Sequence, residues 1–230
     1  MDNPSVQHHQ QQAAGFDQRV AKMAPLRDAL HFLMARVMSD LPRGARVLCV
    51  GVGTGAELLE LAQVFPQWRF TAVEPAAAML TICRQKVDAA GFSERVDFHD
   101  GYLDSLPPCE PFDAATSLLV SHFITDDDAR QAYFSTIAER LAVGGLLINA
   151  DLAADTDTMA FGSLLAVWLR MLAYAGMSDD EVERMRAAFG QSVALRPPSV
   201  FAAMVASAGF TAPVLFFQGL LMHAWFTQRV

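Results

Sequence analysis

Residues 46–59 read RVLCVGVGTGAELL, and this stretch decides the fold. Its first part is a short apolar run of the kind that parallel sheets bury on both faces, and from residue 58 apolar residues return at helical spacing. Gly51, Gly53 and Gly55 lie between the two parts. Glycine allows positive φ and lets a ligand lie directly on the backbone, and the N–H groups that follow face that ligand. The stretch therefore predicts a strand, a turn and a helix that bind a nucleotide-like cofactor.

The glycine motif does not identify the cofactor by itself. Residues 51–56 also satisfy the looser dinucleotide pattern, in which alanine replaces the third glycine. A nicotinamide-dependent oxidoreductase is therefore one alternative, and a non-catalytic cofactor-binding protein is another. A tight turn without any ligand is the plainest alternative for a short motif of this kind.

The composition favours one globular domain whose cysteines are reduced. The 230 residues are 53% hydrophobic, which is enough for one large α/β domain, and 17 basic against 25 acidic residues give a formal charge of −8. This balance argues against a broad nucleic-acid footprint. Cys49, Cys83 and Cys109 are scattered, which predicts a cytoplasmic protein without a zinc site. The apolar stretch 159–177 is interrupted by Arg170, so we expect a buried helix and no membrane span.

Strands alternate with helices along most of the chain, which predicts a doubly wound parallel sheet. The helix before the fifth strand is expected to end at Gly144-Gly145. Between residue 156 and about residue 208 we expect only helices, which would form a helical cap. The link between the last two strands is too short for a crossover helix, so they should be antiparallel. We expect strands at 47–52, 70–73, 96–99, 112–119, 146–150, 212–218 and 223–228, a disordered tail over 1–15 and a single domain over 16–230.

Two acids follow expected strands on the same edge of the sheet. Glu74 lies 19 positions after Gly55, where methyltransferases and dehydrogenases place an acid for the ribose hydroxyls, because a carboxylate can accept two hydrogen bonds from a diol. A solvated carboxylate at a strand end is the alternative. Asp100 ends the third strand, where it would either accept from an adenine amino group or simply cap a loop.

From residue 16 to residue 229 the chain resembles the class I S-adenosylmethionine-dependent methyltransferases. The glycine loop resembles the family's first motif, Glu74 its ribose acid and Asp100-Gly101 its adenine-side motif. Residues 112–115 resemble the strand that approaches the methyl donor, and the terminal antiparallel hairpin distinguishes this family from dehydrogenases. We therefore rank methyl transfer above hydride transfer, with a Rossmann-like, mostly parallel seven-stranded sheet and S-adenosylmethionine as cofactor. The resemblance implies that the cofactor is bound by Gly51, Gly53, Gly55, Glu74, Pro75, Met79, Asp100, Gly101 and Leu118.

Within this class the chain is most similar to the enzymes that transfer a carboxymethyl group to the wobble uridine of tRNA. Residues 16–21, His122-Phe123 and residues 208–218 carry this likeness. Those enzymes place an arginine near the position of Met204, where it would meet the extra carboxylate of their modified cofactor, and methionine cannot pair with a carboxylate. We therefore expect a small or modest-sized acceptor, with wobble-uridine modification as the alternative.

Methyl transfer from a sulfonium is an in-line displacement, so the protein mainly has to hold the acceptor and the methyl group close and aligned. Only some acceptors need a general base. His122, just past the fourth strand, is our candidate base, with an ordinary packed histidine as the alternative. Phe16 and Arg19 are substrate-side candidates on resemblance. Trp168 lies on an apolar helix that either lines an acceptor pocket or belongs to the core or to a homodimer face.

Overall fold

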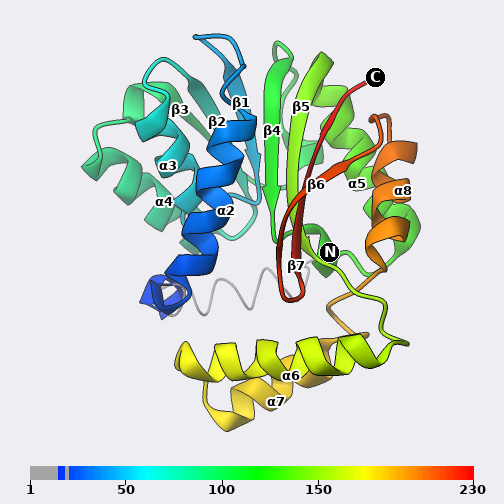
Figure 1. Ribbon diagram of the computed structural model, residues 1–230. Helices are drawn as coiled ribbons and strands as arrows, with labels where there is room; N and C mark the ends of the chain where they lie inside the picture. The colour runs from blue at the N-terminus through cyan, green and yellow to red at the C-terminus, as the bar shows by residue number, and fades with distance from the viewer. Residues whose placement is uncertain (1–14, 19–20) are drawn as a thin grey trace.

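The computed structural model describes residues 15–18 and 21–230, and a sheet of seven strands forms its centre (Figure 1). The strands are β1 (Arg46–Val50), β2 (Arg69–Glu74), β3 (Val96–Asp100), β4 (Phe112–Leu118), β5 (Leu141–Leu152), β6 (Val214–Gly219) and β7 (Met222–Gln228). Their order is β3-β2-β1-β4-β5-β7-β6. The pairs from β3 to β5 are parallel, and β7 is antiparallel to both β5 and β6. The strand order reverses between β1 and β4, and open α/β sheets bind ligands at the carboxyl ends of strands beside such a point.

Helices cover both faces of the sheet and its carboxyl edge (Figure 1). They are α2 (Ala24–Val37), α3 (Ala56–Val64), α4 (Ala77–Ala89), α5 (Asp127–Arg140), α6 (Met159–Tyr174), α7 (Asp179–Ala188) and α8 (Pro198–Ser207), with short 3-10 turns η1 (Ser93–Arg95), η2 (Leu103–Ser105) and η3 (Ser121–Phe123). The helices α2, α3 and α4 pack on one face, and α5 and α8 on the other. We call α6 and α7, which lie beyond the carboxyl ends of the strands, the cap helices.

The two-sided packing follows from the period of two in a strand. In β1, Val47 and Cys49 belong to the core under α2, α3 and α4, whereas Leu48 and Val50 belong to the core under α5 and α8. All four side chains are buried, which explains why this strand is apolar at every position instead of alternating. The apolar run therefore fixes β1 at the centre of the sheet.

The predicted sheet of seven strands with an antiparallel hairpin at its end is confirmed. One predicted boundary was wrong: the helix before β5 ends at Arg140, not at Gly144-Gly145, and β5 begins at Leu141. Leu141 is fully buried, adopts an extended conformation and pairs with Phe112 of β4. Burial of this leucine in the sheet therefore ends the helix before the glycines are reached.

The segment that we expected as a cap divides into two parts. The cap helices α6 and α7 pack with residues of the carboxyl edge, including Leu152 and Leu221. In contrast, Phe201 and Val205 of α8 pack with α5 on the face of the sheet. The predicted range of 156–208 thus includes a helix, α8, that belongs to the layer beside the sheet.

Some expectations concern parts or properties that the fold does not address. We expected a disordered tail over residues 1–15, and positions 1–14 lie outside the described residues. Arg19 lies outside them as well. No helix in the described part of the chain has the length and apolar character needed to cross a membrane. Within residues 15–18 and 21–230, no three His, Cys, Asp or Glu side chains gather as a metal site would require.

Phe134 tests the packing between α5 and α8. It is fully buried, and its ring meets Phe201 edge-on with centroids 5.6 Å apart. We expect Phe134→Ala to lower the free energy of unfolding by about 3 to 5 kcal/mol through the lost contacts and the cavity left behind. Urea unfolding measures the change. Phe32→Ala on α2, where 63% of the side chain is exposed, should change it by less than about 0.5 kcal/mol. Equal effects of the two substitutions would contradict this packing.

Candidate active site

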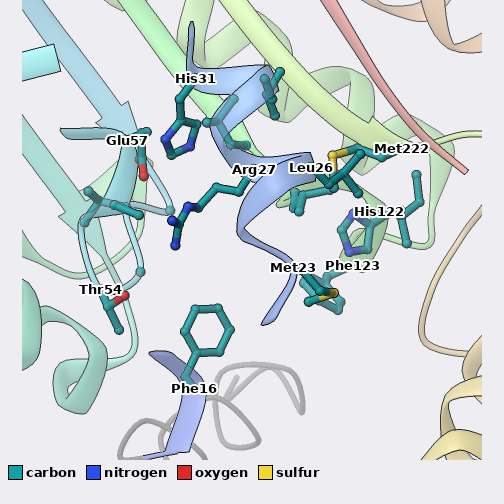
Figure 2. Close-up of a pocket in the computed structure, with 18 of the residues that line it drawn as sticks. Phe16, Met23, Leu26, Arg27, His31, Thr54, Glu57, His122, Phe123 and Met222 are labelled. Carbon is teal, nitrogen blue, oxygen red and sulfur yellow. The ribbon is translucent and has the colours of Figure 1, made fainter. Parts of the chain in front are cut away.

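A cavity of about 340 Å³ lies at the carboxyl edge of the sheet, between the glycine loop, α2 and the cap helices. Figure 2 shows Glu57 and Thr54 on one side of it and His122 and Phe123 on the other, with Arg27 extending from α2 between them. The lining residues are Phe16, Met23, Leu26, Arg27, Leu30, His31, Gly51, Val52, Gly53, Thr54, Ala56, Glu57, Met79, Leu118, Leu119, His122, Phe123, Leu152, Trp168, Leu172, Met185, Val193 and Met222.

The glycine loop is shaped by packing at two positions and is open at the third. Gly51 has φ +69°, and a Cβ there would come within 2.5 Å of the Val120 side chain. Gly55 has φ +85°, and a Cβ there would come within 2.6 Å of the Cys83 sulfur. A Cβ on Gly53 would meet nothing within 4 Å. Gly53 lines the cavity, so its missing side chain leaves room for a ligand against the backbone.

Most backbone N–H groups of this loop are already satisfied within the protein. The expectation that N–H groups face the ligand concerned those of the following helix, and four amides of the loop itself donate inside the protein. The donations are Gly51 N to Val73 O (2.8 Å), Val52 N to Val73 O (3.1 Å), Gly53 N to the Glu74 carboxylate (2.9 Å) and Gly55 N to Val52 O (2.9 Å). A pyrophosphate cradle needs free N–H donors. These four amides are therefore not available to a pyrophosphate.

Glu74 holds the glycine loop in place from the end of β2. One carboxylate oxygen accepts from Gly53 N and the other from Ala76 N, both at 2.9 Å. The side chain is buried, and burial raises its pKa, although these two hydrogen bonds lower it. Each oxygen keeps a second lone pair. The predicted role of Glu74 toward the ribose hydroxyls stays a prediction.

The predicted site residues divide between the cavity and the edge beside it. Those that line the cavity are Gly51, Gly53, Met79, Leu118, His122, Phe16 and Trp168. Gly55, Glu74, Pro75, Asp100 and Gly101 do not line it. Glu74 and Asp100 are paired in register at the ends of β2 and β3, so the two acids are brought together as expected. His99 lies in β3, and its Nε2 contacts the Ser105 hydroxyl at 2.8 Å.

His122 lies in η3, directly after β4, and is held by a buried carboxylate. Its Nδ1 contacts Asp151 Oδ1, and its backbone N–H donates to the same oxygen at 3.1 Å. Both side chains are almost completely inaccessible, yet the imidazole lines the cavity. In the neutral form of the ring, a carboxylate that accepts from Nδ1–H leaves Nε2 as the acceptor. A neutral histidine in this tautomer can accept a proton from a ligand.

Asp151 has a second set of partners on its other oxygen. Arg130 of α5 donates to Oδ2 at 3.0 Å, and the Ser121 hydroxyl donates to the same oxygen. Burial raises the pKa of Asp151, but electrostatic interaction with His122 and Arg130 and the hydrogen bonds from His122 and Ser121 more than offset it, so the pKa lies below its usual value. Asp151 is therefore an anion at neutral pH.

Sequence reasoning missed Asp151 and Arg130. Asp151 could have been found from the sequence, because it lies at the carboxyl end of β5, in the row of strand ends that also holds Glu74 and Asp100. Arg130 carried no signal, since a lone arginine in a helix is usually exposed. In the structure it is wholly buried, and it also donates to Ser121 Oγ and to the Ala194 carbonyl, at 2.9 and 3.1 Å.

Two further titratable side chains line the cavity near the glycine loop. Burial raises the pKa of Glu57 to about 8, and the charge of Glu74 adds to this effect. Burial lowers the pKa of His31 to about 4, helped by the charge of Arg27. Both groups are therefore mostly uncharged at pH 7 in the protein alone.

Comparison with known proteins supports the assignment of the fold. Residues 47–145 match a family described as a methyltransferase domain. The carboxy-S-adenosyl-L-methionine synthase of Campylobacter lari is 26% identical over 177 residues, which are 76% of this chain and 74% of that protein. The 3-hydroxy-5-methyl-1-naphthoate 3-O-methyltransferase of Streptomyces sahachiroi is 26% identical over 150 residues, which are 61% of this chain and 42% of that protein.

A solved structure of a proposed O-methyltransferase from Nostoc punctiforme shares the fold, with a TM-score of 0.67 and 16% identity over 96% of this chain. This chain spans 60% of the length of that one. The four amides that are satisfied inside the protein argue against a dinucleotide, and the terminal hairpin agrees with the methyltransferase fold. The strand order, the cavity beside the glycine loop and the methyltransferase-domain match over residues 47–145 agree with the fold of the class I S-adenosylmethionine-dependent methyltransferases.

Proposed function

We propose that this chain transfers a methyl group from S-adenosylmethionine to a hydroxyl group of a small, largely apolar acceptor, with His122 as the general base. One observation carries the proposal: an imidazole backed by a buried carboxylate lines the same cavity as the glycine loop. The base and the cofactor loop would then act on one bound acceptor.

The residues around the glycine loop fit S-adenosylmethionine. Gly53 leaves open space for a ligand on the backbone, and Met79 of α4 supplies an apolar wall. The satisfied amides of the loop suit a ligand without phosphate groups. When bound, the cofactor supplies a methyl group that its sulfonium already activates.

His122 would take the proton of the acceptor hydroxyl. Asp151 holds Nδ1–H, which orients the ring and leaves Nε2 free to accept. Nε2 of His122 would take the hydroxyl proton as the acceptor oxygen is methylated, and the bound cofactor would supply the methyl group and keep the electron pair of its carbon–sulfur bond. The imidazolium that forms is stabilised by the adjacent Asp151 carboxylate.

The walls on the other side of the cavity are apolar. Trp168 and Leu172 of α6, Met185 of α7 and Val193 lie there, opposite Leu26 of α2. Such walls favour an acceptor with a mostly apolar body, and few polar groups would fix its orientation. The naphthoate O-methyltransferase that this chain resembles is named for an acceptor of this kind.

A second candidate function comes from the sequence relatives. Carboxy-S-adenosyl-L-methionine synthases of Campylobacter lari and Dichelobacter nodosus match most of this chain. The methionine at position 204, where an arginine was expected, does not count against this candidate. Met204 lies in α8 on the face of the sheet and does not line the cavity. Mass spectrometry of the nucleoside products separates the two activities: S-adenosylhomocysteine reports methyl transfer, and a carboxylated sulfonium reports the second candidate.

Homodimerisation through the cap helices is also part of the proposal. Met159 and Tyr174, at the two ends of α6, are apolar and largely exposed. The acidic net charge disfavours a nucleic-acid partner on the same surface.

His122→Gln tests the base. Removal of a general base should lower kcat for S-adenosylhomocysteine formation by about 10²- to 10⁴-fold. Affinity for S-adenosylhomocysteine should stay unchanged, because His122 lies on the acceptor side. The measurement uses a panel of small phenols and aromatic hydroxy acids as acceptors. His99→Gln in β3 is the matched control and should keep the wild-type rate; a His122→Gln rate equal to that of the control would remove His122 from the mechanism.

Arg130→Met tests the support of the base. Loss of one partner from a buried ion pair leaves Asp151 as an uncompensated buried charge, and we expect the free energy of unfolding to fall by about 3 to 5 kcal/mol. Arg196→Met removes an exposed pair with Asp127 and should cost less than about 1 kcal/mol. Chemical denaturation at pH 7 compares the two variants, and similar losses would mean that burial does not distinguish these pairs.

A further inference from the structure

Two leucines adopt a backbone conformation that bulky residues normally avoid. Leu119 has φ +60° and Leu220 has φ +57°, and in the described part of the chain every other residue with positive φ is a glycine. A leucine in this region is an outlier, because its Cβ comes too close to the following carbonyl oxygen. A glycine would make either turn with less strain. The turn alone therefore does not account for a leucine at these positions, and the side chain is what a glycine would lack.

The backbone of Leu119 is fixed from both sides. Leu119 N donates to the Ala150 carbonyl at 2.7 Å, which extends the pairing of β4 with β5 by one residue. The next residue, Val120, lies against the glycine loop, where a Cβ on Gly51 would come within 2.5 Å of its side chain. His122 follows in η3. The positive φ of Leu119 therefore turns the chain between the sheet, the glycine loop and the base.

The side chain of Leu119 belongs to the part of the cavity that we assign to the acceptor. It lines the cavity and packs in the apolar cluster of the cap helices, with Trp168, Leu172 and Met222. Leu220 packs in the same cluster, from the turn between β6 and β7, but it does not line the cavity. Of the two strained leucines, only Leu119 is therefore placed to contact a ligand.

We propose that Leu119 is a specificity-determining residue, whose side chain limits the size of the acceptor beside His122. This inference rests on the proposed function, since it names what the acceptor meets in the cavity. A leucine on a fixed backbone cannot yield to a larger ligand without disturbing β4 or the glycine loop. Local strain of this kind is stored where a site needs a side chain in one place.

Binding of two acceptors of different size tests the side chain. Phenol has one ring and 2-naphthol has two, and calorimetry measures the Kd of each for protein that holds S-adenosylhomocysteine. Leu119→Ala and Leu119→Gly should each raise the ratio of the phenol Kd to the 2-naphthol Kd by about tenfold or more, because the smaller ligand loses the leucine contact and the larger one gains room. Leu220→Ala, at the other strained leucine, is the matched control and should leave the ratio unchanged.

Thermal melting tests the backbone. Glycine adopts positive φ without strain and alanine does not, so Leu119→Gly should melt at a higher temperature than Leu119→Ala. At Leu118, which lies in β4 without a positive φ, the order should be reversed, because glycine loses more conformational freedom on folding. The same order at both positions would show that Leu119 is not strained and would overturn the inference.

The outcomes distinguish this inference from the proposed function. If the wild-type protein with S-adenosylhomocysteine binds neither compound, the proposed acceptor class fails and the inference fails with it. If the wild-type protein binds both and the Leu119 variants keep its ratio, the inference alone is overturned. An equal loss of affinity for both compounds would overturn it too, by showing a general disturbance of the cavity. A wild-type protein that binds both and methylates neither would refute O-methylation, whereas a raised ratio in the variants would still support the size limit.

Discussion

The carboxyl edge of this protein depends on one wholly buried carboxylate, Asp151. A buried charge is tolerated only where opposite charge and hydrogen bonds surround it. Asp151 accepts from Ser121 and His122 after β4, from Arg130 of α5 and from the next N–H in its own strand. Three segments that are far apart in the sequence are therefore held in one geometry, and the imidazole acquires its tautomer and its direction from the same contacts.

The glycine loop differs from a phosphate-binding loop in the partners of its amides. In a phosphate site the loop amides point outward, whereas here Val73, Glu74 and Val52 accept four of them. The glycines still provide positive φ and close approach. The glycines therefore determine the backbone shape of the loop, whereas the partners of its amides determine whether the loop can bind an anion.

Local patterns predicted the fold well because the elements carry their own periodicity and end signals. The apolar run of β1 forms the expected strand, and the last two strands are antiparallel as their short link predicted. Gly53 and His122 were expected at one edge of the sheet, because they follow strands whose carboxyl ends meet, and both line the cavity. The burial of Arg130 and Glu57 depends on partners distant in sequence, and no local pattern records such burial. The early end of α5 has the same cause, because Leu141 is drawn into the sheet.

Backbone hydrogen bonds hold together the two connections of the cap helices and join one of them to His122. Ala154 N donates to Arg196 O, which joins the segment that leads into α6 to the segment that leads toward α8. Ala194 N donates to the carbonyl of His122. Residues 155–193 therefore form an excursion whose two ends are fixed beside His122. A change of side chains within this excursion would alter the wall of the cavity and leave the contacts between His122 and Asp151 in place.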